Sequence, residues 1–373
     1  MITKLKSKIN VPFFDYPSVF KEYENELACI FNDVCSKGAY ILQEELSSFE
    51  KNLAHYSKCK YALGVANGTD ALIIALRAAG VKPGDEVVFC THTYVATAAA
   101  IHFVGAIPIP VECGSDHMID VTKIEQVITS KTTAIMPTQL NGRCCDMDPI
   151  MDLCKKRDLL LIEDAAQALG ATYKGQYAGT FGAAGTISFY PAKTLGCFGD
   201  GGAILTNDDD MYQKMFELRD HGRNQDGDVV SWGLNSRLDN LQAAILDFKL
   251  NHYDEFVRKR RNIASLYHGN LSGIKELILP PQPDEGDRFD VFQNYEIEAE
   301  RRDELKDYLK QNNVGTIIQW AGKCVHQFEN LNISGNFPFS EKMISQSLLL
   351  PMFPTLTDEQ VFKVIELVKE FYQ

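Results

Sequence analysis

Short apolar runs that alternate with helical stretches are the feature that most limits the possible folds of this chain. Between about Tyr61 and Thr206, stretches of helical composition separate most of these runs. A strand of a parallel sheet is covered on both faces, so it shows a continuous apolar run instead of alternation. The pattern predicts an α/β domain with a mainly parallel central sheet. The expected strands are Tyr61–Val65, Glu86–Cys90, Ala106–Val111, Thr133–Pro137, Leu159–Ile162, Gly185–Phe189 and Gly202–Leu205.

The pattern changes after Asp239, where a smaller α+β domain is expected to follow the large one. We predict a large domain, with an N-terminal helical segment, over residues 1–245 and a small domain over residues 246–373. The boundary is expected inside a long helix. The predicted elements of this part are helices over Asp239–His268, Arg301–Gln311 and Asp358–Phe371 and strands over Phe289–Glu298 and Thr316–Gln319, and Thr91–Phe103 of the large domain is also expected to be helical.

Net charge argues against some classes of binding partner, and the cysteine spacing argues against some kinds of site. The formal net charge is −13, and an acidic chain binds nucleic acid or an anionic membrane poorly. A locally basic site for a small anion is still compatible with this charge. The basic cluster Arg258–Arg261 follows Asp254 and Glu255 in an amphipathic pattern, which predicts a solvated helix face. The 10 cysteines include no Cys-x-x-Cys pair, so neither a metal site nor a redox dithiol is expected.

No targeting or membrane segment is expected. The stretch from Met1 to Lys8 has no apolar core of the kind found in secretory signals. The most apolar later stretch, Thr97–Val111, is interrupted by His102, Gly105 and two prolines, so it is too broken to span a bilayer. These observations predict a cytoplasmic protein.

Polar fragments follow several predicted strands, at the edge where open α/β sheets bind ligands. Asn67-Gly68-Thr69-Asp70 opens a helix, and free N–H groups with a hydroxyl at a helix N-terminus suit a phosphate. An ordinary N-cap is the alternative for this fragment. Glu163-Asp164-Ala165-Ala166-Gln167 delivers two carboxylates and an amide from an apolar strand. A buried carboxylate needs a cationic partner or hydrogen bonds, although Asp164 could also be a simple helix cap.

A single lysine follows another apolar strand in Ser188-Phe189-Tyr190-Pro191-Ala192-Lys193, and the glycine-rich Gly199-Asp200-Gly201-Gly202 comes soon after. The order Gly-x-x-x-x-Gly-Lys-Ser/Thr is absent, and so is Gly-x-Gly-x-x-Gly. Nucleotide hydrolysis and dinucleotide binding are therefore not supported. A lysine with a neutral amine can instead act as a nucleophile toward a carbonyl compound.

Together the fragments fit pyridoxal phosphate, which needs a lysine for its aldehyde, a cradle for its phosphate and a carboxylate at its ring nitrogen. Lys193 and Asp164 are the expected catalytic residues. Each fragment alone has an ordinary structural explanation, but their joint presence in this order does not. The expected cofactor-binding residues are Gly68, Thr69, Asp70, Tyr94, Asp164, Gln167, Ser188 and Lys193, with Gln167 at the ring hydroxyl and Tyr94 on the ring face.

The motifs of nearly the whole chain resemble those of the DegT/DnrJ/EryC/StrS-type sugar aminotransferases, in the fold type I group of aspartate aminotransferase. The resemblance implies pyridoxal phosphate, with pyridoxamine phosphate as its alternate form, and a homodimer in which Asn235 reaches the cofactor phosphate of the neighbouring subunit. The motifs that carry it are Gly38–Leu42, Asn67–Leu72, Pro83–Val87, Glu163–Gln167, Ser188–Lys193, Gly199–Gly202 and Gly233–Asp239.

Two positions depart from the family pattern. Thr194 stands where members commonly carry Asn, and Gln43 stands where they commonly carry Gly. Thr194 is polar and small, so a tuning effect is expected, whereas the role of Gln43 near the site entrance is open. A related subgroup has histidine in place of the lysine and removes a hydroxyl group, and Lys193 argues against that reaction.

The segment Ile317–Gln327 is similar to that of members that aminate the 3-keto carbon of dTDP-linked 6-deoxy sugars. Lys323 and His326 follow a predicted strand and a glycine, an arrangement suited to a diphosphate. A solvated Lys323 and a packed His326 are the alternative. Arg219 with its neighbour His221 is expected either to line the site or to end a helix in solvent. The expected substrate-binding residues are Tyr190, Arg219, Lys323 and His326.

The function predicted from the resemblance is transfer of an amino group from L-glutamate to the 3-keto carbon of a dTDP-linked keto sugar. The product would serve an amino sugar of a surface polysaccharide, such as lipopolysaccharide O-antigen, or of a natural product. Amination of a 4-keto carbon on a dTDP or UDP sugar is the alternative within the same chemistry. A regulatory relative that binds pyridoxal phosphate without turnover is the competing class.

Overall fold

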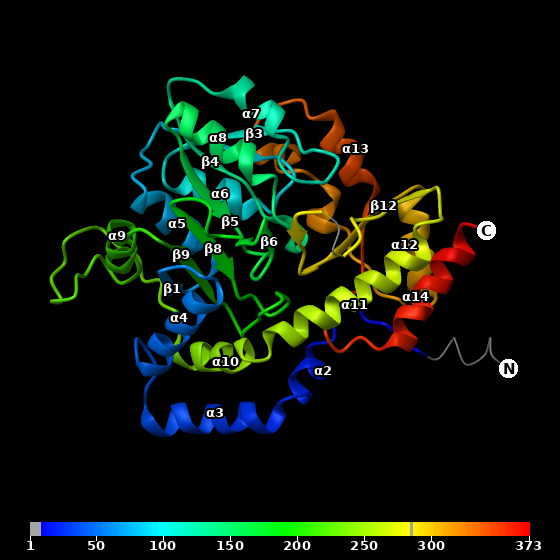
Figure 1. Ribbon diagram of the computed structural model, residues 1–373, viewed down its shortest axis with the longest axis horizontal. Helices are drawn as coiled ribbons and strands as arrows, with labels where there is room; N and C mark the ends of the chain where they lie inside the picture. The colour runs from blue at the N-terminus through cyan, green and yellow to red at the C-terminus, as the bar shows by residue number, and fades with distance from the viewer. Residues whose placement is uncertain (1–8, 284–285) are drawn as a thin grey trace.

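A seven-stranded sheet forms the centre of the larger part of the molecule in the computed structural model (Figure 1). Five neighbouring strands pair in parallel, and the strand beside them, second from the other edge of the sheet, runs antiparallel to both of its neighbours. The predicted mainly parallel sheet is therefore confirmed. In spatial order the strands are β1 (Tyr61–Val65), β9 (Gly202–Thr206), β8 (Ala184–Ser188), β5 (Leu160–Asp164), β4 (Thr132–Met136), β2 (Glu86–Cys90) and β3 (Ile107–Val111), of which β9 is the antiparallel one.

The structure describes residues 9–283 and 286–373. The first residues, Met1 to Lys8, for which no secretory signal is expected, lie outside the described residues. In the part of the chain that is described, no helix combines the length and the hydropathy that crossing a bilayer would require.

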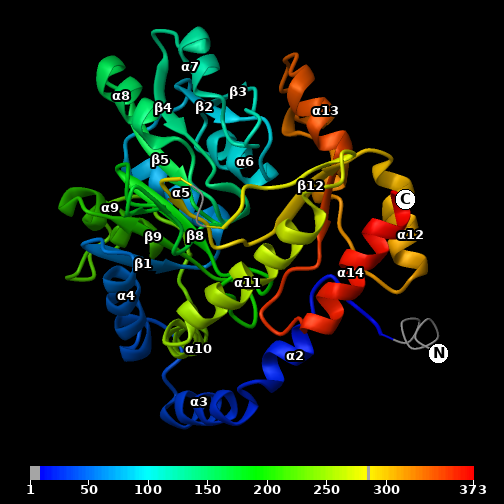
Figure 2. The same ribbon diagram turned by 45° about the vertical axis from the view of Figure 1, so that its right-hand side comes forward.

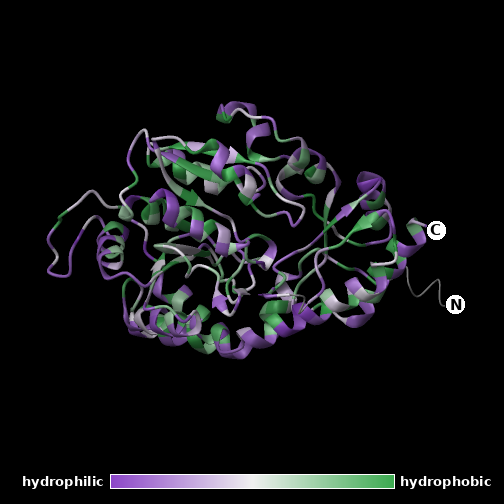
Figure 3. Cartoon of the chain, turned by 45° about the horizontal axis from the view of Figure 1, so that its top comes forward, coloured by the Kyte–Doolittle hydropathy of each residue, from purple (hydrophilic) through white to green (hydrophobic). Residues whose placement is uncertain are grey.

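Helices cover both faces of the sheet because successive strand residues point to opposite sides. In β2, Val87 and Phe89 pack into one hydrophobic core, whereas Val88 and Cys90 pack into the other. Figure 3 shows this division as apolar strands between helices whose outer surfaces are polar. One face carries α5 (Gly68–Ala78), α6 (Val95–Phe103) and α9 (Asp209–Arg219), and the other carries α4 (Glu44–Tyr56), α8 (Met147–Arg157) and α10 (Asn240–Leu250).

A smaller α+β part follows, and the long helix α11 (Tyr253–Leu271) leads into it (Figure 2). Its antiparallel sheet has the order β10-β12-β13. The strands are β10 (Leu277–Ile278), β12 (Tyr295–Ala299) and β13 (Ser347–Leu350), and the helices are α12 (Arg302–Gln311), α13 (Pro338–Gln346) and α14 (Asp358–Phe371). The remaining elements of the chain are α2 (Tyr16–Lys21), α3 (Glu24–Lys37), α7 (Val121–Val127), β6 (Thr172–Tyr173), β7 (Gln176–Tyr177) and β11 (Arg288–Phe289).

The division between the two parts differs in detail from the ranges expected from the sequence. Val11 lies in the core of the small part and pairs with Val314. The start of α11, at Phe256 and Val257, belongs to a core of the large part, and its later residues belong to the small one. The range 1–245 stays a prediction, and the segment at Val11 packs with the small domain.

The expected single helix over Asp239–His268 is two helices, α10 and α11, separated by Asn251 and His252. Neither glycine nor proline marks this break. Both helices bury an apolar face, so the amphipathic pattern runs through it without interruption. The expected helix over Thr91–Phe103 is also shorter, since α6 begins only at Val95.

The strands predicted in the small domain are shorter than expected. The run Phe289–Glu298 divides into the end of β11 and most of β12, and residues 290–294 between them are irregular. The run Thr316–Gln319 contributes a single bridge, from Ile317 to Leu349. A short 3₁₀ helix, Gln319–Gly322, follows, with Trp320 in the left-handed region at φ 48°.

Glu163 anchors the loop after β7 to the sheet. Its buried carboxylate accepts the backbone N–H groups of Gly179 at 2.8 Å, Phe181 at 2.6 Å and Gly182 at 3.2 Å, and the amide of Gln139 at 2.7 Å. Burial raises the pKa of this carboxyl group, and the four donors act against the rise. Glu163 therefore points away from the ligand-binding edge and has a structural role, unlike its neighbour in sequence.

Replacing Glu163 with Ala is expected to destabilise the protein by about 3 kcal/mol or more, because several buried donors lose their acceptor at once. Glu163→Gln retains one acceptor oxygen, so its free energy of unfolding should fall clearly less than that of Glu163→Ala. Urea unfolding of the two variants and the wild type measures the difference. A loss below about 1 kcal/mol for Glu163→Ala would contradict this role.

Candidate functional site

A cavity of about 560 Å³ opens at the carboxyl edge of the large sheet, where several strands of the predicted site end. Its volume lies in the range of small-molecule and cofactor pockets. Of the predicted residues, it collects Gly68, Thr69, Tyr94, Asp164, Gln167, Ser188, Tyr190 and Lys193. The other lining residues are Asn67, Leu72, Thr93, Ala96, Thr138, Leu140, Ala166, Asp200 and Trp320.

Lys193 lies in the turn that follows β8. The N–H of Lys193 donates to the carbonyl oxygen of Tyr190 at 2.8 Å, which closes the turn around Pro191. Burial of the amine lowers the pKa of Lys193 to about 8, although the charge of Asp164 acts to raise it. A substantial fraction of the amine is therefore neutral near pH 8, as a nucleophile requires.

Asp164 is the last residue of β5, the strand next to β8, and its side chain is buried. Its carboxylate accepts the hydroxyl of Thr97 at 2.7 Å and the N–H of Ala166 at 3.3 Å. Burial raises the pKa of Asp164, while these two donors and the charge of Lys193 lower it. A buried carboxylate thus faces the same cavity as a buried amine.

Three threonine hydroxyls extend from Asp164 into the wall of the cavity. The hydroxyl of Thr97 lies 2.8 Å from that of Thr93, which lies 2.9 Å from that of Thr138. The sequence analysis did not single out these residues. Thr93 and Thr97 flank Tyr94 in sequence, but the pattern gave no indication that they face a carboxylate on another strand.

The N-terminus of α5 forms the floor of the cavity. The side chain of Asn67 caps the helix by accepting the N–H of Asp70 at 2.8 Å. Gly68 and Thr69 are the first two residues of the helix, so their N–H groups have no acceptor within it. Asp70 was predicted together with them, but its N–H is used by the cap and its side chain is not part of the cavity lining.

Gly202 allows this floor to form. A Cβ atom at Gly202, the first residue of β9, would lie 2.5 Å from the carbonyl carbon of Asn67. Only a residue without a side chain lets β9 approach the backbone of the Asn67–Gly68 turn this closely. The glycine-rich fragment therefore supports the candidate phosphate cradle by packing beneath it.

Tyr94 and Gln167 lie on the walls of the cavity. Tyr94 stands at the N-cap position of α6 and is 55% exposed, so its ring is available to cover a ligand. The side-chain oxygen of Gln167 accepts the N–H of Asn141 at 2.8 Å and the amide of Asn294 at 3.4 Å. Since the oxygen takes both donors, the amide nitrogen of Gln167 is left to donate toward the cavity.

Arg219 and His326 are expected from the sequence to bind substrate, but neither belongs to the lining of the cavity. Arg219 is buried, and its guanidinium donates to the carboxylate of Glu50 and to the carbonyl oxygen of Gly64. The ring nitrogens of His326 are bonded to the hydroxyl of Thr91 at 2.6 Å and to the carboxylate of Glu341 at 3.0 Å. Their polar groups are occupied within the protein, so both residues have a structural role.

Lys323, Asn235 and His221 are exposed and outside the lining of this chain's cavity. The ammonium of Lys323, which the sequence predicts beside the substrate, lies 6.0 Å from the ring centre of Phe328. Gln43 is the N-cap residue of α4 and donates to the carbonyl oxygen of Ile41 at 2.9 Å, also outside the cavity. Tyr190 is the predicted substrate residue that does line the cavity.

Trp320 is a site residue that the sequence analysis missed. It lies within the segment singled out for Lys323 and His326, but the indole lines the cavity and those two side chains do not. Its ring packs 5.1 Å from that of His92, which is buried. Its left-handed backbone, seldom adopted by large residues, could not be anticipated from the sequence.

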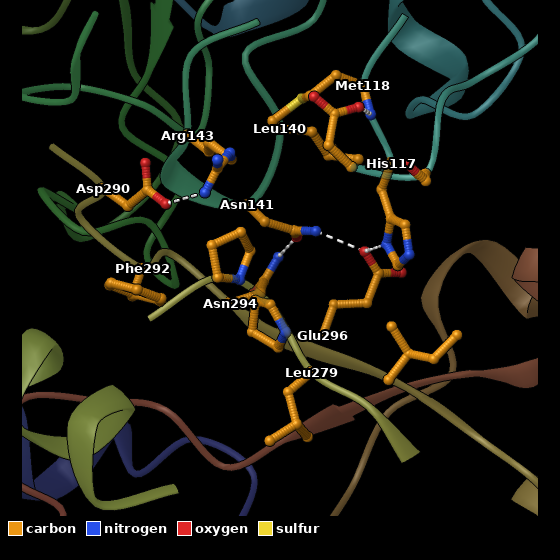
Figure 4. Close-up of a pocket in the computed structure, with 15 residues that line it drawn as sticks. His117, Met118, Leu140, Asn141, Arg143, Leu279, Asp290, Phe292, Asn294 and Glu296 are labelled. Atoms are coloured by element: carbon orange, nitrogen blue, oxygen red, sulfur yellow. Dashed lines mark hydrogen bonds and ion pairs between the residues drawn. The ribbon is translucent and has the colours of Figure 1, made fainter. Parts of the chain in front are cut away.

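A second cavity of about 280 Å³ lies across the Leu140–Asn141 segment from the first (Figure 4). In Figure 4 the side chain of Asn141 joins Asn294 to Glu296, and Glu296 contacts His117. Burial acts to raise the pKa of the Glu296 carboxyl, but the charge and hydrogen bond of His117 lower it to about 2, and the carboxylate in turn raises the pKa of His117 against the effect of burial. This network connects the small domain to Gln167 in the first cavity.

Known proteins resemble this chain along nearly its whole length. Residues 21–369 match the model of the DegT/DnrJ/EryC1/StrS aminotransferase family. The dTDP-3-amino-3,4,6-trideoxy-alpha-D-glucose transaminase of Streptomyces venezuelae is 37% identical over 372 residues, which cover 97% of this chain and 96% of that protein. A pleiotropic regulatory protein of Geobacillus stearothermophilus is 39% identical over 370 residues, 98% of this chain and 99% of that protein.

A solved structure matches the fold equally closely. The crystal structure of S. venezuelae DesV in complex with a ketimine intermediate has a TM-score of 0.94 and 36% sequence identity. The match covers 98% of this chain and 99% of that one.

The low pKa of Lys193 predicts where pyridoxal phosphate attaches. Incubation of cofactor-free protein with pyridoxal phosphate at pH 8, followed by borohydride reduction, should add one pyridoxyl group, located by peptide mass on Lys193. Asp164→Asn removes a charge that raises the pKa of this amine, so the pH midpoint of adduct formation should fall below about 8. An adduct on another lysine, or a midpoint near that of an ordinary lysine at about 10.4, would contradict the assignment.

Proposed function

The chain belongs to the DegT/DnrJ/EryC1/StrS aminotransferase family, and we propose that it transfers an amino group from L-glutamate to the 3-keto carbon of a dTDP-linked 6-deoxy sugar. The family match confirms the resemblance seen in the sequence motifs, and the chain is an aminotransferase. One observation carries the proposal. A buried amine of lowered pKa and a buried carboxylate face a single cavity above the N-terminus of α5.

The residues present fit pyridoxal phosphate. The carboxylate of Asp164 accepts hydrogen bonds from two neutral donors, the hydroxyl of Thr97 and the N–H of Ala166. It can therefore still accept a hydrogen bond from a protonated ring nitrogen. The N–H groups of Gly68 and Thr69, together with the hydroxyl of Ser188, suit its phosphate. Tyr94 covers a ring face, and Gln167 donates to the ring hydroxyl.

Pyridoxal phosphate, when bound, supplies an aldehyde that takes up the amine and a ring that accepts electrons. Lys193 holds the aldehyde through its Nζ until the amino donor displaces it. The freed Nζ would move a proton from the α-carbon of glutamate to the aldehyde carbon of the cofactor, and in the second half of the reaction it would move a proton from that carbon to the sugar carbon that gains the amine. Asp164 keeps the ring nitrogen protonated throughout. Pyridoxamine phosphate is the form between the two halves.

On the substrate side, Tyr190 and Trp320 line the cavity and are proposed to contact the sugar. The 3-keto choice is supported by the name of the Streptomyces relative, a 3-amino sugar transaminase. The anionic nucleotide would meet local donors in spite of the formal net charge of −13. Because Arg219 and His326 are occupied within the protein, the donors for the diphosphate must come from other residues.

A homodimer with shared active sites is part of the proposal. Asn235 is exposed and is not among the lining residues of the cavity of its own chain, which agrees with a role at the cofactor phosphate of the neighbouring subunit. The segment between α9 and Asn235 extends away from the body of the molecule (Figure 1) and exposes Trp232 by 91% and Val229 by 68%. Apolar side chains this exposed are typical of surfaces that pack against another chain.

The proposed place of this reaction is the cytoplasm, in the synthesis of an amino sugar for a surface polysaccharide or a natural product. Amination at a 4-keto carbon on a dTDP or UDP sugar is the runner-up. A regulatory protein without turnover is the second candidate, because the Geobacillus relative is a pleiotropic regulatory protein.

One assay distinguishes these functions. Protein loaded with pyridoxal phosphate receives L-glutamate with either the 3-keto or the 4-keto dTDP-6-deoxyhexose, and mass spectrometry follows the aminated product. We expect product from the 3-keto sugar and a cofactor that converts to its amine form with glutamate alone. Product from only the 4-keto sugar would overturn the regiochemistry, and a cofactor that never converts would favour the regulatory class. Lys193→Ala is the control without turnover.

A further inference from the structure

The turn that carries Lys193 is tightly folded, yet its own hydrogen bonds do not fix the lysine. A Cβ atom at Gly196 would lie 2.5 Å from the carbonyl oxygen of Pro191, so the turn closes on itself with no room for a side chain. The N–H of Lys193 bonds within the turn. The other two groups of the peptides that flank Lys193, the carbonyl oxygen of Ala192 and the N–H of Thr194, bond outside the turn.

Gln293 holds both of these peptide groups with one side chain. Its Oε1 accepts the N–H of Thr194 at 2.7 Å, and its Nε2 donates to the carbonyl oxygen of Ala192 at 2.9 Å. The first partner can only donate and the second can only accept, so a single orientation of the amide satisfies both. Because peptide groups are planar, the backbone at Lys193 can rotate only about φ and ψ. Gln293 restrains both rotations because it bonds to the peptide group on each side of Lys193.

Gln293 is itself rigidly held. It is 7% exposed, and the guanidinium of Arg260, 1% exposed, donates to its carbonyl oxygen at 3.1 Å and to that of Met352 at 3.0 Å. Gly142 lies directly beneath, where a Cβ atom would approach the backbone nitrogen of Gln293 to 2.6 Å. A side chain fixed this firmly transmits the position of the small domain to the turn.

The next residue reaches the opposite wall of the cavity. Asn294 donates to Asn141 at 2.9 Å and to the side-chain oxygen of Gln167 at 3.4 Å (Figure 4 shows the contact with Asn141). Two consecutive residues before β12 therefore contact the turn of Lys193 and the amide of Gln167. This pairing explains why residues 290–294 are irregular instead of continuing as a strand.

Thr194 has a defined partner as well. Its hydroxyl lies 2.7 Å from that of Tyr253, which also donates to the carbonyl oxygen of Leu169 at 2.7 Å. The backbone N–H of Thr194 is the group that Gln293 accepts. Both the side chain and the backbone of the residue after Lys193 are therefore fixed from outside the turn, which gives Thr194 a structural account at this position.

We propose that Gln293 is a positioning residue, which orients the Lys193 amine toward Asp164 by holding the peptide groups on both sides of it. The inference rests on the proposed role of Lys193 as the residue that attaches pyridoxal phosphate. It adds a link between the small domain and the reacting amine, since Gln293 enters the site from the segment that leads into β12. Misplacing a reacting group by about 1 Å can cost about 100-fold in rate.

Gln293→Leu removes both hydrogen bonds at similar size, and Gln242→Leu is its matched control. The amide of Gln242 holds Phe198 in the same way, accepting its N–H at 2.8 Å and donating to its carbonyl oxygen at 3.3 Å, but five residues beyond Lys193. Three quantities are measured for the wild type and both variants: amide exchange of Thr194 without cofactor, the pH midpoint of the visible absorbance of bound pyridoxal phosphate, and kcat with KM for glutamate.

The expected result separates positioning from general stability. Gln293→Leu should speed exchange of the Thr194 amide, shift the absorbance midpoint and lower kcat by about tenfold or more, with KM within about twofold. Gln242→Leu should leave all of these near the wild-type values. Equal behaviour of the two variants, or an unchanged midpoint and kcat in Gln293→Leu, would overturn the proposal. Wild-type protein without an adduct on Lys193 would instead overturn the role of the lysine itself.

Gln293→Glu keeps the test decisive if the leucine variant does not fold. A carboxylate accepts the N–H of Thr194 but has no proton for the carbonyl oxygen of Ala192, whereas the protonated acid can make both bonds. Its kcat relative to wild type should therefore rise as the pH falls toward the pKa of a buried carboxyl. A ratio that does not vary with pH would contradict the clamp.

Discussion

Two ionisable groups of opposite sign at one edge of a sheet, the buried Asp164 and the half-buried Lys193, are the constraint on which this structure depends. An isolated charge in the interior is too costly to keep, so the fold must either pair it or bond it. The parallel neighbours β5 and β8 bring Asp164 and the turn of Lys193 to the same edge. Burial moves the two pKa values in opposite directions, upward for the acid and downward for the amine, and each charge opposes the shift of the other. The resulting pair suits proton transfer because burial weakens the preference of each group for its charged form.

The rest of the molecule supplies what this pair needs. Buried hydroxyls beginning at Thr97 orient the acid, and the cap at Asn67 shapes a floor of backbone N–H groups. The small domain holds the turn of Lys193 through Gln293 and braces Gln167 through Asn294. The cavity is thus a joint product of both domains, although most of its lining residues come from the large one.

Sequence reasoning succeeded where chemistry lies at the end of a strand. The central strands fall within one or two residues of the expected runs, and most of the predicted cofactor residues share one cavity, because strand order brings successive strand ends together. Asp70 and Asn235 are outside its lining. Prediction from the sequence failed for residues whose hydrogen-bond partner lies far away along the chain. Arg219 is bonded to Glu50, 169 positions away, and no local pattern distinguishes such a residue from a substrate ligand. The role of Gln293 could not be predicted from the sequence because its side chain bonds to backbone groups of Ala192 and Thr194. Such bonds do not depend on which side chains stand at those two positions.

The central claim is that one cavity holds pyridoxal phosphate between Lys193 and Asp164, and a crystal structure of the protein with this cofactor tests it most directly. The account predicts continuous density from Nζ of Lys193, the ring nitrogen within hydrogen-bond distance of Asp164, and the phosphate at the N–H groups of Gly68 and Thr69. A cofactor attached to a different lysine, such as the buried Lys249, or a phosphate bound away from α5, would contradict it.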